Sequence, residues 1–290
     1  MTDPTPQPFE PSAAQIQATI SVLGDDSSVL QQSARRQLLA WGKRSVPLLK
    51  RGAEADHMST RMRCRSLLRA IEVRALGARI SRLRLGQISR HSALELLEGA
   101  VLGAQMVNTF VPDSRKLAAQ LLREANSLRH ECVGRSTQGC AKLLVERLHG
   151  QFGLRGCDAE EVGVDHLLID RVMQSKVGAP VMLSLIYLVV ARWAGMSAVG
   201  VAIPNHFLIR IHGPRPILLD PFHGGRVILK SDCARYLRAT GVERVRDHLR
   251  DLSDREFLIH AFRALWGELP SCHSGARTML GEALGQLEAS

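Results

Sequence analysis

Apolar and polar positions along the chain predict many helices and one short group of strands. Between Arg61 and Leu76 the apolar residues recur every three or four positions, which is the spacing of one helical face. Residues 113–150 predict two helices on the same criterion, and residues 253–290 predict two more, separated by Pro270. This last segment carries an apolar stripe that we expect to pack in a core: Phe257, Leu258, Phe262, Leu265 and Trp266.

The most apolar helix is predicted to begin at Pro180 and to end before Gly195. Proline suits a first helical position, because the missing N–H would be unpaired there and its φ is already set. The residues that follow are apolar on almost every face, and their number falls short of the roughly 20 that a membrane span needs. We therefore expect a helix buried inside a folded domain.

Strands are predicted directly after this helix. Residues 199–203 and 206–211 are rich in β-branched and apolar side chains. Residues 212–215 contain a Gly-Pro pair and predict a turn. The short run 216–220 should return antiparallel and close at the turn 221–225.

A turn centred near residue 213 or 214 sets His206 almost opposite Asp220. Directly opposed residues on antiparallel strands bring their Cβ atoms to roughly 5 Å, so we expect the imidazole and the carboxylate to touch. A carboxylate on one ring nitrogen orients a catalytic histidine whose other nitrogen faces a nucleophile. The same contact also serves as a structural pair at the end of a hairpin. The residues leave both interpretations open.

Three motifs in this region resemble those of a known family. They are Lys176-Val177-Gly178-Ala179-Pro180, Pro204-Asn205-His206-Phe207-Leu208 and Asp220-Pro221-Phe222-His223-Gly224-Gly225. Together they resemble the core of the transglutaminase-like superfamily, and within it the bacterial SirB-type branch. The resemblance covers roughly residues 90 to 250. It implies an α+β fold, with a papain-like core of packed helices and a small antiparallel sheet.

Active members of that family carry a cysteine nucleophile at the first turn of the buried helix, where the helix dipole and the histidine lower its pKa. Here that position, just after Gly178, falls on or beside Pro180, which has no nucleophile. SirB-type members commonly lack this cysteine too, so the resemblance implies that His206 and Asp220 are a vestigial pair. The other motif residues expected at the cleft are Asn205, Phe207, Pro221, Phe222, Gly224 and Gly225.

Two residues remain as candidates for a replacement nucleophile. Ser184 lies one turn further into the predicted helix, where a serine more often bonds a backbone carbonyl. Its hydroxyl is also a far poorer nucleophile than a thiolate. Cys157 lies in the preceding segment. If Cys157 or another thiol arrives from a different segment to meet His206, the protein is an acyl-transfer enzyme, a cysteine peptidase or a transglutaminase.

The basic charge of the chain is concentrated near its N-terminus. Residues 35–90 hold 15 Lys or Arg against three acids, whereas the rest holds 23 against 25. Residues 34–38 recur in similar form at 64–68, a layout that resembles the paired helices of HEAT-like proteins.

A row of arginines in this region is a candidate for nucleic-acid binding. Arg61, Arg65 and Arg69 share one face of the predicted helix, and such a row suits phosphate groups. Only six of the 38 basic residues are lysine, which favours an ordinary solvated face in an arginine-rich protein. No aromatic residues interleave the row, so a nucleic-acid partner remains the weaker hypothesis.

No cofactor and no metal site are expected. Two groups of potential zinc ligands stand out, one made of His130, Cys132, Cys140 and His149, the other of His212, His223 and Cys233. The cysteine spacing of the first group is too long for a zinc knuckle. Two members of the second lie in turns, where polar residues are common.

Composition supports a folded protein of the cytoplasm. The start of the chain is proline-rich and shows no basic-then-apolar secretory pattern. Six scattered cysteines suit reduced thiols. We predict a disordered lead-in (1–14), a basic HEAT-like helical region (15–86), a SirB-type transglutaminase-like domain (87–250) and a short helical tail (251–290).

The favoured hypothesis is a non-catalytic module that acts in regulation or assembly by binding another protein or a peptide. We expect no membrane partner. An acyl-transfer enzyme and a nucleic-acid-associated factor are the alternatives.

Overall fold

The computed structural model describes residues 10–85, 90–108, 111, 113–242 and 248–289. Helices dominate these residues, and the strands form two small sheets, as the predicted α+β class requires. Within the described part, no helix combines the length and the apolar content needed to cross a membrane. Most of the predicted lead-in lies outside the described residues.

The chain divides into two compact units, Met1–Ala78 and Arg79–Ser290. The first unit contains α1 (Ala13–Val22), α2 (Ser28–Trp41), a 3₁₀ turn (Gly42–Ser45), α3 (Val46–Gly52) and most of α4 (Met58–Ile80). A capping box begins α1, because Ser12 and Gln15 each accept a hydrogen bond from the backbone N–H of the other. This helix therefore begins two residues inside the predicted lead-in.

Apolar side chains from all four helices form the core of the first unit. Its buried members are Ile16, Ile20, Leu23, Ala34, Leu38, Leu49, Cys64, Leu67 and Ile71. The two similar segments 34–38 and 64–68 thus both contribute to a single core.

The second unit holds the remaining elements. Its helices are α5 (Arg90–Val107), α6 (Ser114–Glu131), α7 (Thr137–Val145), α8 (Ile169–Ser175), α9 (Pro180–Trp193), α10 (Lys230–Ala239), α12 (Asp254–Glu268) and α13 (Ser274–Ala289). A π-helical turn (Glu146–Gln151) and 3₁₀ turns at Ala159–Glu161, Val164–Leu167 and Ser271–His273 connect them. The strands are β1 (Arg155–Gly156), β2 (Val177–Gly178), β3 (Ala198–Ile203), β4 (His206–Ile211), β5 (Ile217–Asp220) and β6 (Arg226–Ile228).

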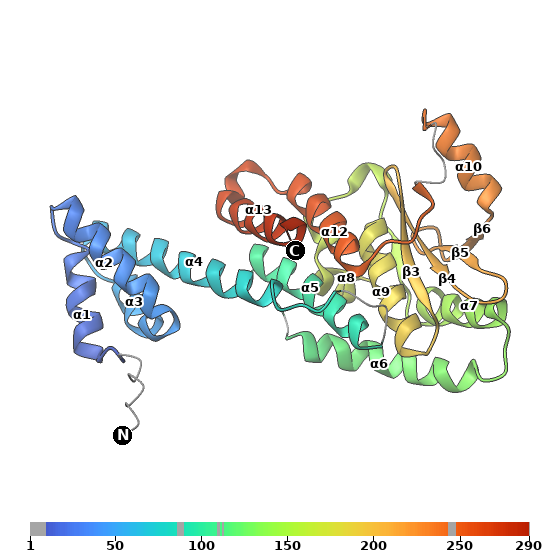
Figure 1. The fold of residues 1–290 in the computed structure, drawn as a ribbon, viewed down its shortest axis with the longest axis horizontal. Coiled ribbons are helices and arrows are strands. Elements are labelled where there is room, and N and C mark those ends of the chain that lie inside the picture. The colour runs from blue at the N-terminus through green and yellow to red at the C-terminus, as the bar shows by residue number, and fades with distance from the viewer. Residues whose placement is uncertain (1–9, 86–89, 109–110, 112, 243–247, 290) are drawn as a thin grey trace, which may run out of the picture. The chain divides into compact units, whose positions relative to one another are not determined.

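Helix α9 lies between the sheet and the helices α5 and α6 (Figure 1). Pro180 begins the helix, as predicted, and every later residue of α9 is buried. Burial on all sides explains why this helix is apolar on almost every face. Strands β3 to β6 form an antiparallel sheet in sequential order, and β1 and β2 form a short parallel pair.

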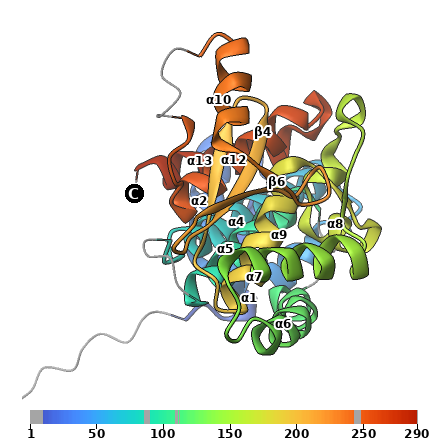
Figure 2. The ribbon, with the colours of Figure 1, turned by 90° about the vertical axis from the view of Figure 1, so that its right-hand side faces the viewer.

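Helices α12 and α13 pack against each other and against α5 (Figure 1). A Cβ atom added to Gly99 or Gly103 of α5 would meet Leu258 at 2.3 Å or Phe262 at 2.8 Å, so these glycines permit the close approach of α12. Four residues of the predicted stripe are buried, whereas Trp266 is 41% exposed. Figure 2, with the sheet toward the viewer, shows α10 at one end of this unit and α6 and α7 at the other.

Candidate functional site

His206 and Asp220 are placed by tight turns of the antiparallel sheet. Ile203 pairs with His206, so only Pro204 and Asn205 connect β3 to β4. Asn205 has a φ of 57°, the left-handed conformation that the second central residue of a type II turn adopts and that asparagine tolerates. His206 consequently begins β4, while Asp220 ends β5.

The register places the pair diagonally, whereas the sequence predicted that the two residues are almost opposite. Strands β4 and β5 pair Ile209 with Leu219, and one step further along this register Asp220 faces Leu208. His206 lies two residues beyond Leu208 on the same face of the sheet. The difference arises because the connection is centred on residue 214, the later of the two predicted positions. The side chains nevertheless meet, with His206 Nε2 2.9 Å from Asp220 Oδ1.

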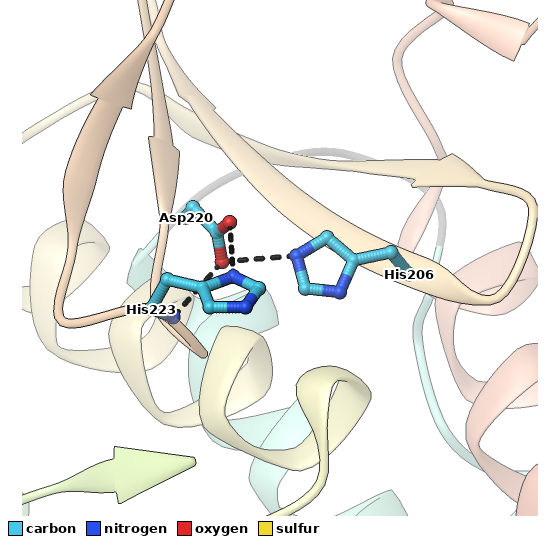
Figure 3. A group of neighbouring side chains, drawn as sticks. All are labelled: His206, Asp220 and His223. Carbon is cyan, nitrogen blue, oxygen red and sulfur yellow. Dashed lines mark hydrogen bonds and ion pairs between the residues drawn. The ribbon is translucent and has the colours of Figure 1, made fainter. Parts of the chain in front are cut away.

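Asp220 is the centre of a hydrogen-bonded cluster (Figure 3). Asp220 is 2% exposed, and its carboxylate accepts the ring N–H groups of His206, at 2.9 Å, and of His223, at 2.7 Å. The backbone N–H of His223 also donates to it, at 3.2 Å. Burial alone would raise the pKa of Asp220, but these hydrogen bonds outweigh burial and hold the pKa below its ordinary value. The carboxylate is therefore ionised at neutral pH.

His223 is a member of this cluster that the sequence analysis did not assign to it. The sequence does contain a signal for this contact. His223 follows Asp220 by three residues in a turn, and an aspartate side chain commonly bonds to groups of the turn that it begins. The ring of His223 is half exposed, whereas that of His206 is 15% exposed.

The turn 221–225 holds the cluster in place. Gly224 and Gly225 both have a φ of 71°, a conformation that glycine adopts without strain. The N–H of Gly225 donates to the Asp220 carbonyl at 2.7 Å. Pro221 is buried, and Phe222 packs edge-on against the His206 ring with centroids 5.7 Å apart. The motif residues therefore have direct structural roles around Asp220.

A cavity of about 930 Å³ adjoins the cluster. It is lined by residues of the sheet, the start of α9, α10 and α12, and most of its wall is apolar. The lining includes Val162, Leu167, Pro180, Val181, Ile203, Asn205, His206, Phe207, Asp220, Phe222, His223, Cys233, Tyr236 and Ala264. Its volume lies at the upper end of the range for small-molecule sites, roughly 300 to 1,000 Å³.

The predicted position of the missing nucleophile faces this cavity. Pro180, the first residue of α9, lines it together with His206 and Asp220. Ser184 is fully buried one turn further on, and its hydroxyl donates to the Phe207 carbonyl at 3.4 Å. That hydroxyl thus has a backbone acceptor, as is common for a serine inside a helix.

The backbone of Cys157 lies close to the start of α9, and the residue is buried. Strands β1 and β2 pair Gly156 with Gly178, and the Cys157 N–H donates to the Gly178 carbonyl at 3.2 Å. The Cys157 side chain is 8% exposed, and burial raises the pKa of its thiol. Within the described part of the chain, Cys157 is not among the residues that line the cavity.

Cys233 of α10 does line the cavity, although the sequence analysis did not name it as a nucleophile. It packs with Val201, Leu208 and Leu218 in an apolar cluster and is 3% exposed. Burial, together with the negative charges of nearby aspartates, raises the pKa of this thiol. The signal for its placement was the four-residue spacing of Cys233 and Leu237, which forms the buried face of α10.

The arginine row of α4 is less uniform than its spacing predicted. Arg65 and Arg69 are exposed, but Arg61 is half-buried. Its guanidinium donates to the carbonyls of Ala55 and Asp56, at 3.0 and 3.4 Å. Nucleic-acid binding by this face stays a prediction.

Neither group of zinc ligands that the sequence suggested comes together as a set. In the part of the chain that the structure describes, one group of three potential ligands does so, namely His206, Asp220 and His223.

The buried helix α9, the antiparallel sheet and the His206–Asp220 pair are the features that the sequence motifs led us to expect of a transglutaminase-like protein. A family description of the transglutaminase-like superfamily matches residues 115–263, which is about half of the chain. The chain belongs to this superfamily.

Two relatives are similar over shorter stretches. A UPF0162 protein of Vibrio cholerae serotype O1 (strain ATCC 39315 / El Tor Inaba N16961) is 30% identical over 137 residues, which are 46% of this chain and 50% of the relative. A UPF0162 protein of Xylella fastidiosa (strain 9a5c) is 36% identical over 103 residues, which are 35% of this chain and 34% of the relative. The similarity thus spans half or less of each relative's length. No solved structure matches the chain.

Proposed function

We propose that this chain is a non-catalytic transglutaminase-like module that binds a peptide or protein segment in the cavity beside His206 and Asp220. The observation that carries the proposal is the start of α9. Pro180 occupies the first helical position and lines the same cavity as the pair. Active relatives carry their cysteine at this helix start, and this chain has an apolar ring there.

The other candidate nucleophiles are poorly placed for chemistry. Ser184 is fully buried with its hydroxyl on a backbone carbonyl. Cys157 and Cys233 are buried, and burial raises the pKa of both thiols, whereas catalysis needs a lowered one. This distribution supports binding over acyl transfer.

The cavity has the properties of a binding site. Most of its wall is apolar and offers area for burial, and Asn205, His206 and Asp220 are among the residues that add polar groups. A cleft that keeps the histidine and the carboxylate but lacks the nucleophile is still able to bind what active relatives cut. The bound segment would be short, because the cavity admits only a few side chains.

Finer assignments belong to the same proposal. The motifs around Pro180, His206 and Asp220 support the SirB-type branch. The single core built from segments 34–38 and 64–68 supports a HEAT-like arrangement of the first unit. We also place the protein in the cytoplasm, on the strength of its cysteine usage.

The binding proposal is tested with a variant that fills the cavity. Ala264 lines the cavity from α12 and is half-buried, so Ala264→Trp adds bulk inside it. Glu282 is exposed on α13, and Glu282→Trp serves as the matched control. Peptides are selected on the full chain from a displayed random library, and their affinities are measured by fluorescence anisotropy. We expect Ala264→Trp to weaken binding by about tenfold or more and the control to leave it unchanged.

Equal binding by Ala264→Trp would contradict the proposed site. The non-catalytic part has its own assay, in which a glutamine-containing peptide and a fluorescent amine are incubated with the full chain. No amine incorporation is expected. Incorporation that is lost in Cys157→Ser, Cys233→Ser or Ser184→Ala would establish the acyl-transfer enzyme instead.

A further inference from the structure

The cluster of His206, Asp220 and His223 has a composition that suits a metal ion. We propose that these three side chains bind one zinc(II) ion at the wall of the cavity. The inference goes beyond the proposed function, because the metal site neither requires a bound peptide nor depends on one. Its test is therefore independent of the peptide assay.

The ligand atoms already converge. One ligand atom from each residue lies within 4.8 Å of the other two. Asp220 draws the two rings together, since His206 Nε2 lies 2.9 Å from Oδ1 and His223 Nδ1 lies 2.7 Å from Oδ2 (Figure 3). Zinc bonds to nitrogen and oxygen of about 2.0 to 2.2 Å place neighbouring ligands of a tetrahedral site roughly 3.4 Å apart. Each histidine nitrogen therefore needs to move away from the carboxylate oxygen it contacts by roughly 0.5 to 0.7 Å, and any pair of ligand atoms at the 4.8 Å limit has to close by about 1.4 Å.

The donor set selects the kind of metal. Two imidazoles and one carboxylate suit zinc and its transition-metal neighbours, whereas magnesium and calcium favour oxygen ligands alone. Three protein ligands leave a fourth position open toward the cavity, as in zinc sites that keep a water or a substrate. A nitrogen that binds the metal carries no proton, so each ring would hold its N–H on the other nitrogen.

The surrounding structure holds the ligands in place. The His223 N–H and the ring of Phe222 fix Asp220 and His206, and such outer contacts normally strengthen metal sites. The carboxylate oxygens of Asp220 lie between the two rings and supply the oxygen ligand. One group opposes binding, because Arg226 Nε lies 4.0 Å from Asp220 Oδ2. Its side chain is 64% exposed and is free to swing toward water.

Metal binding by thiols elsewhere in the chain has to be distinguished from metal binding at this cluster. Cys272 Sγ lies 3.4 Å from His273 Nδ1, and Cys140 donates to the Cys132 carbonyl. Burial, with a side-chain hydrogen bond to Cys140, raises the pKa of Cys132 to about 12, which makes a thiolate there unfavourable. Cobalt(II) distinguishes these sites, since thiolate ligation produces an intense near-ultraviolet band that histidine and carboxylate ligation lacks.

The test uses the full chain after removal of metal with a chelator. Zinc(II) affinity is measured by competition with a chromophoric chelator, and cobalt(II) spectra report the ligand type. We expect one site per chain and no thiolate band. His223→Ala should weaken zinc binding by on the order of 100-fold, because it removes a direct ligand from a half-exposed position without touching the core. His212→Ala is the matched control, since His212 pairs with Asp251 outside the cluster.

A second variant tests the electrostatic part. Arg226→Ala removes the opposing charge and should tighten zinc binding by about twofold to fivefold. The proposal is overturned by the absence of a zinc site tighter than about millimolar. A thiolate band, or equal affinities of the unaltered chain and His223→Ala, would also overturn it, because the metal would then lie elsewhere.

Discussion

Arg192 and Asp254 form the most deeply buried ion pair among the described residues, each 3% exposed. The two terminal guanidinium nitrogens of Arg192 lie 2.8 and 2.7 Å from the two carboxylate oxygens of Asp254. Arg192 Nε also donates to the Ala198 carbonyl at 2.9 Å, so the pair connects the end of α9 to β3 and α12. A buried pair of this kind gains little over apolar side chains, but the loss of one partner leaves the other charge uncompensated.

This pair gives a prediction at the residue scale. Asp254→Ala should lower the free energy of unfolding by about 3 to 5 kcal/mol, because Arg192 is then buried without its counter-ion. The double variant Arg192→Met with Asp254→Ala should be more stable than Asp254→Ala alone. Urea denaturation followed by circular dichroism measures both changes. A double variant that is less stable than the single one would show that the arginine is tolerated without its partner.

Helix α12 begins with a capping box that matters at the scale of the element. The Ser253 hydroxyl accepts the Glu256 N–H at 3.2 Å, and the Glu256 carboxylate accepts the Ser253 N–H at 2.8 Å. Arg250 donates to the same carboxylate at 2.5 Å. This hydrogen bond from Arg250, with those from Ser253, lowers the pKa of Glu256 to about 2. The start of the helix that packs on α5 is thereby coupled to a titrating group.

The lowered pKa predicts an acid-dependent loss of stability. The unfolded chain protonates Glu256 near its ordinary pKa of 4.5, before the folded chain does. Stabilisation by Glu256 is therefore complete above about pH 4.5 and disappears as the pH falls toward 2. The difference in unfolding free energy between the unaltered chain and Glu256→Gln should shrink over that window. Urea denaturation at a series of pH values checks this.

Two controls accompany the acid experiment. Glu282→Gln alters an exposed glutamate of α13, and the difference in unfolding free energy between it and the unaltered chain should not shrink as the pH falls. Ser253→Ala removes the other half of the box and should cost about 1 kcal/mol. A constant gap between the unaltered chain and Glu256→Gln from pH 5 to 2 would mean that Arg250 does not hold the carboxylate in solution.

At the scale of the whole molecule, the chain consists of two units with separate cores. Leu38 is fully buried in the core of the first unit, and Leu188 is fully buried in α9 of the second. Units of this kind do not have to unfold together, so a single transition is not required.

Matched cavity variants test this independence. Leu38→Ala and Leu188→Ala should each cost about 2 to 5 kcal/mol in the unit that carries the change. In calorimetry of the full chain we expect two transitions, with Leu38→Ala lowering the midpoint of one and Leu188→Ala that of the other. A single transition that shifts with both variants would show instead that the units are coupled.

Local signals made several elements predictable. Helix α9 begins at Pro180 and ends just before Gly195. The turns around Asn205, residue 214 and Gly224 mark the ends of the strands. Proline and glycine give such signals because their own φ preferences fix or permit the turn. The contact between His206 and Asp220 followed from a single hairpin. The predicted register of β4 and β5 was wrong because it depends on whether the turn is centred on residue 213 or 214. The residue types in the turn do not decide between these two centres.

The sequence by itself determined the α+β class, the buried helix and the pair of side chains at the hairpin, since each depends on residues close together in the chain. Only the tertiary structure decided what surrounds that pair. Cys157 is buried, Cys233 lines the cavity, and His223 contacts Asp220. These placements depend on how β1, α10 and the 221–225 turn pack against the sheet. Packing between distant segments is set by the shape of the whole core, to which no single stretch of sequence gives access.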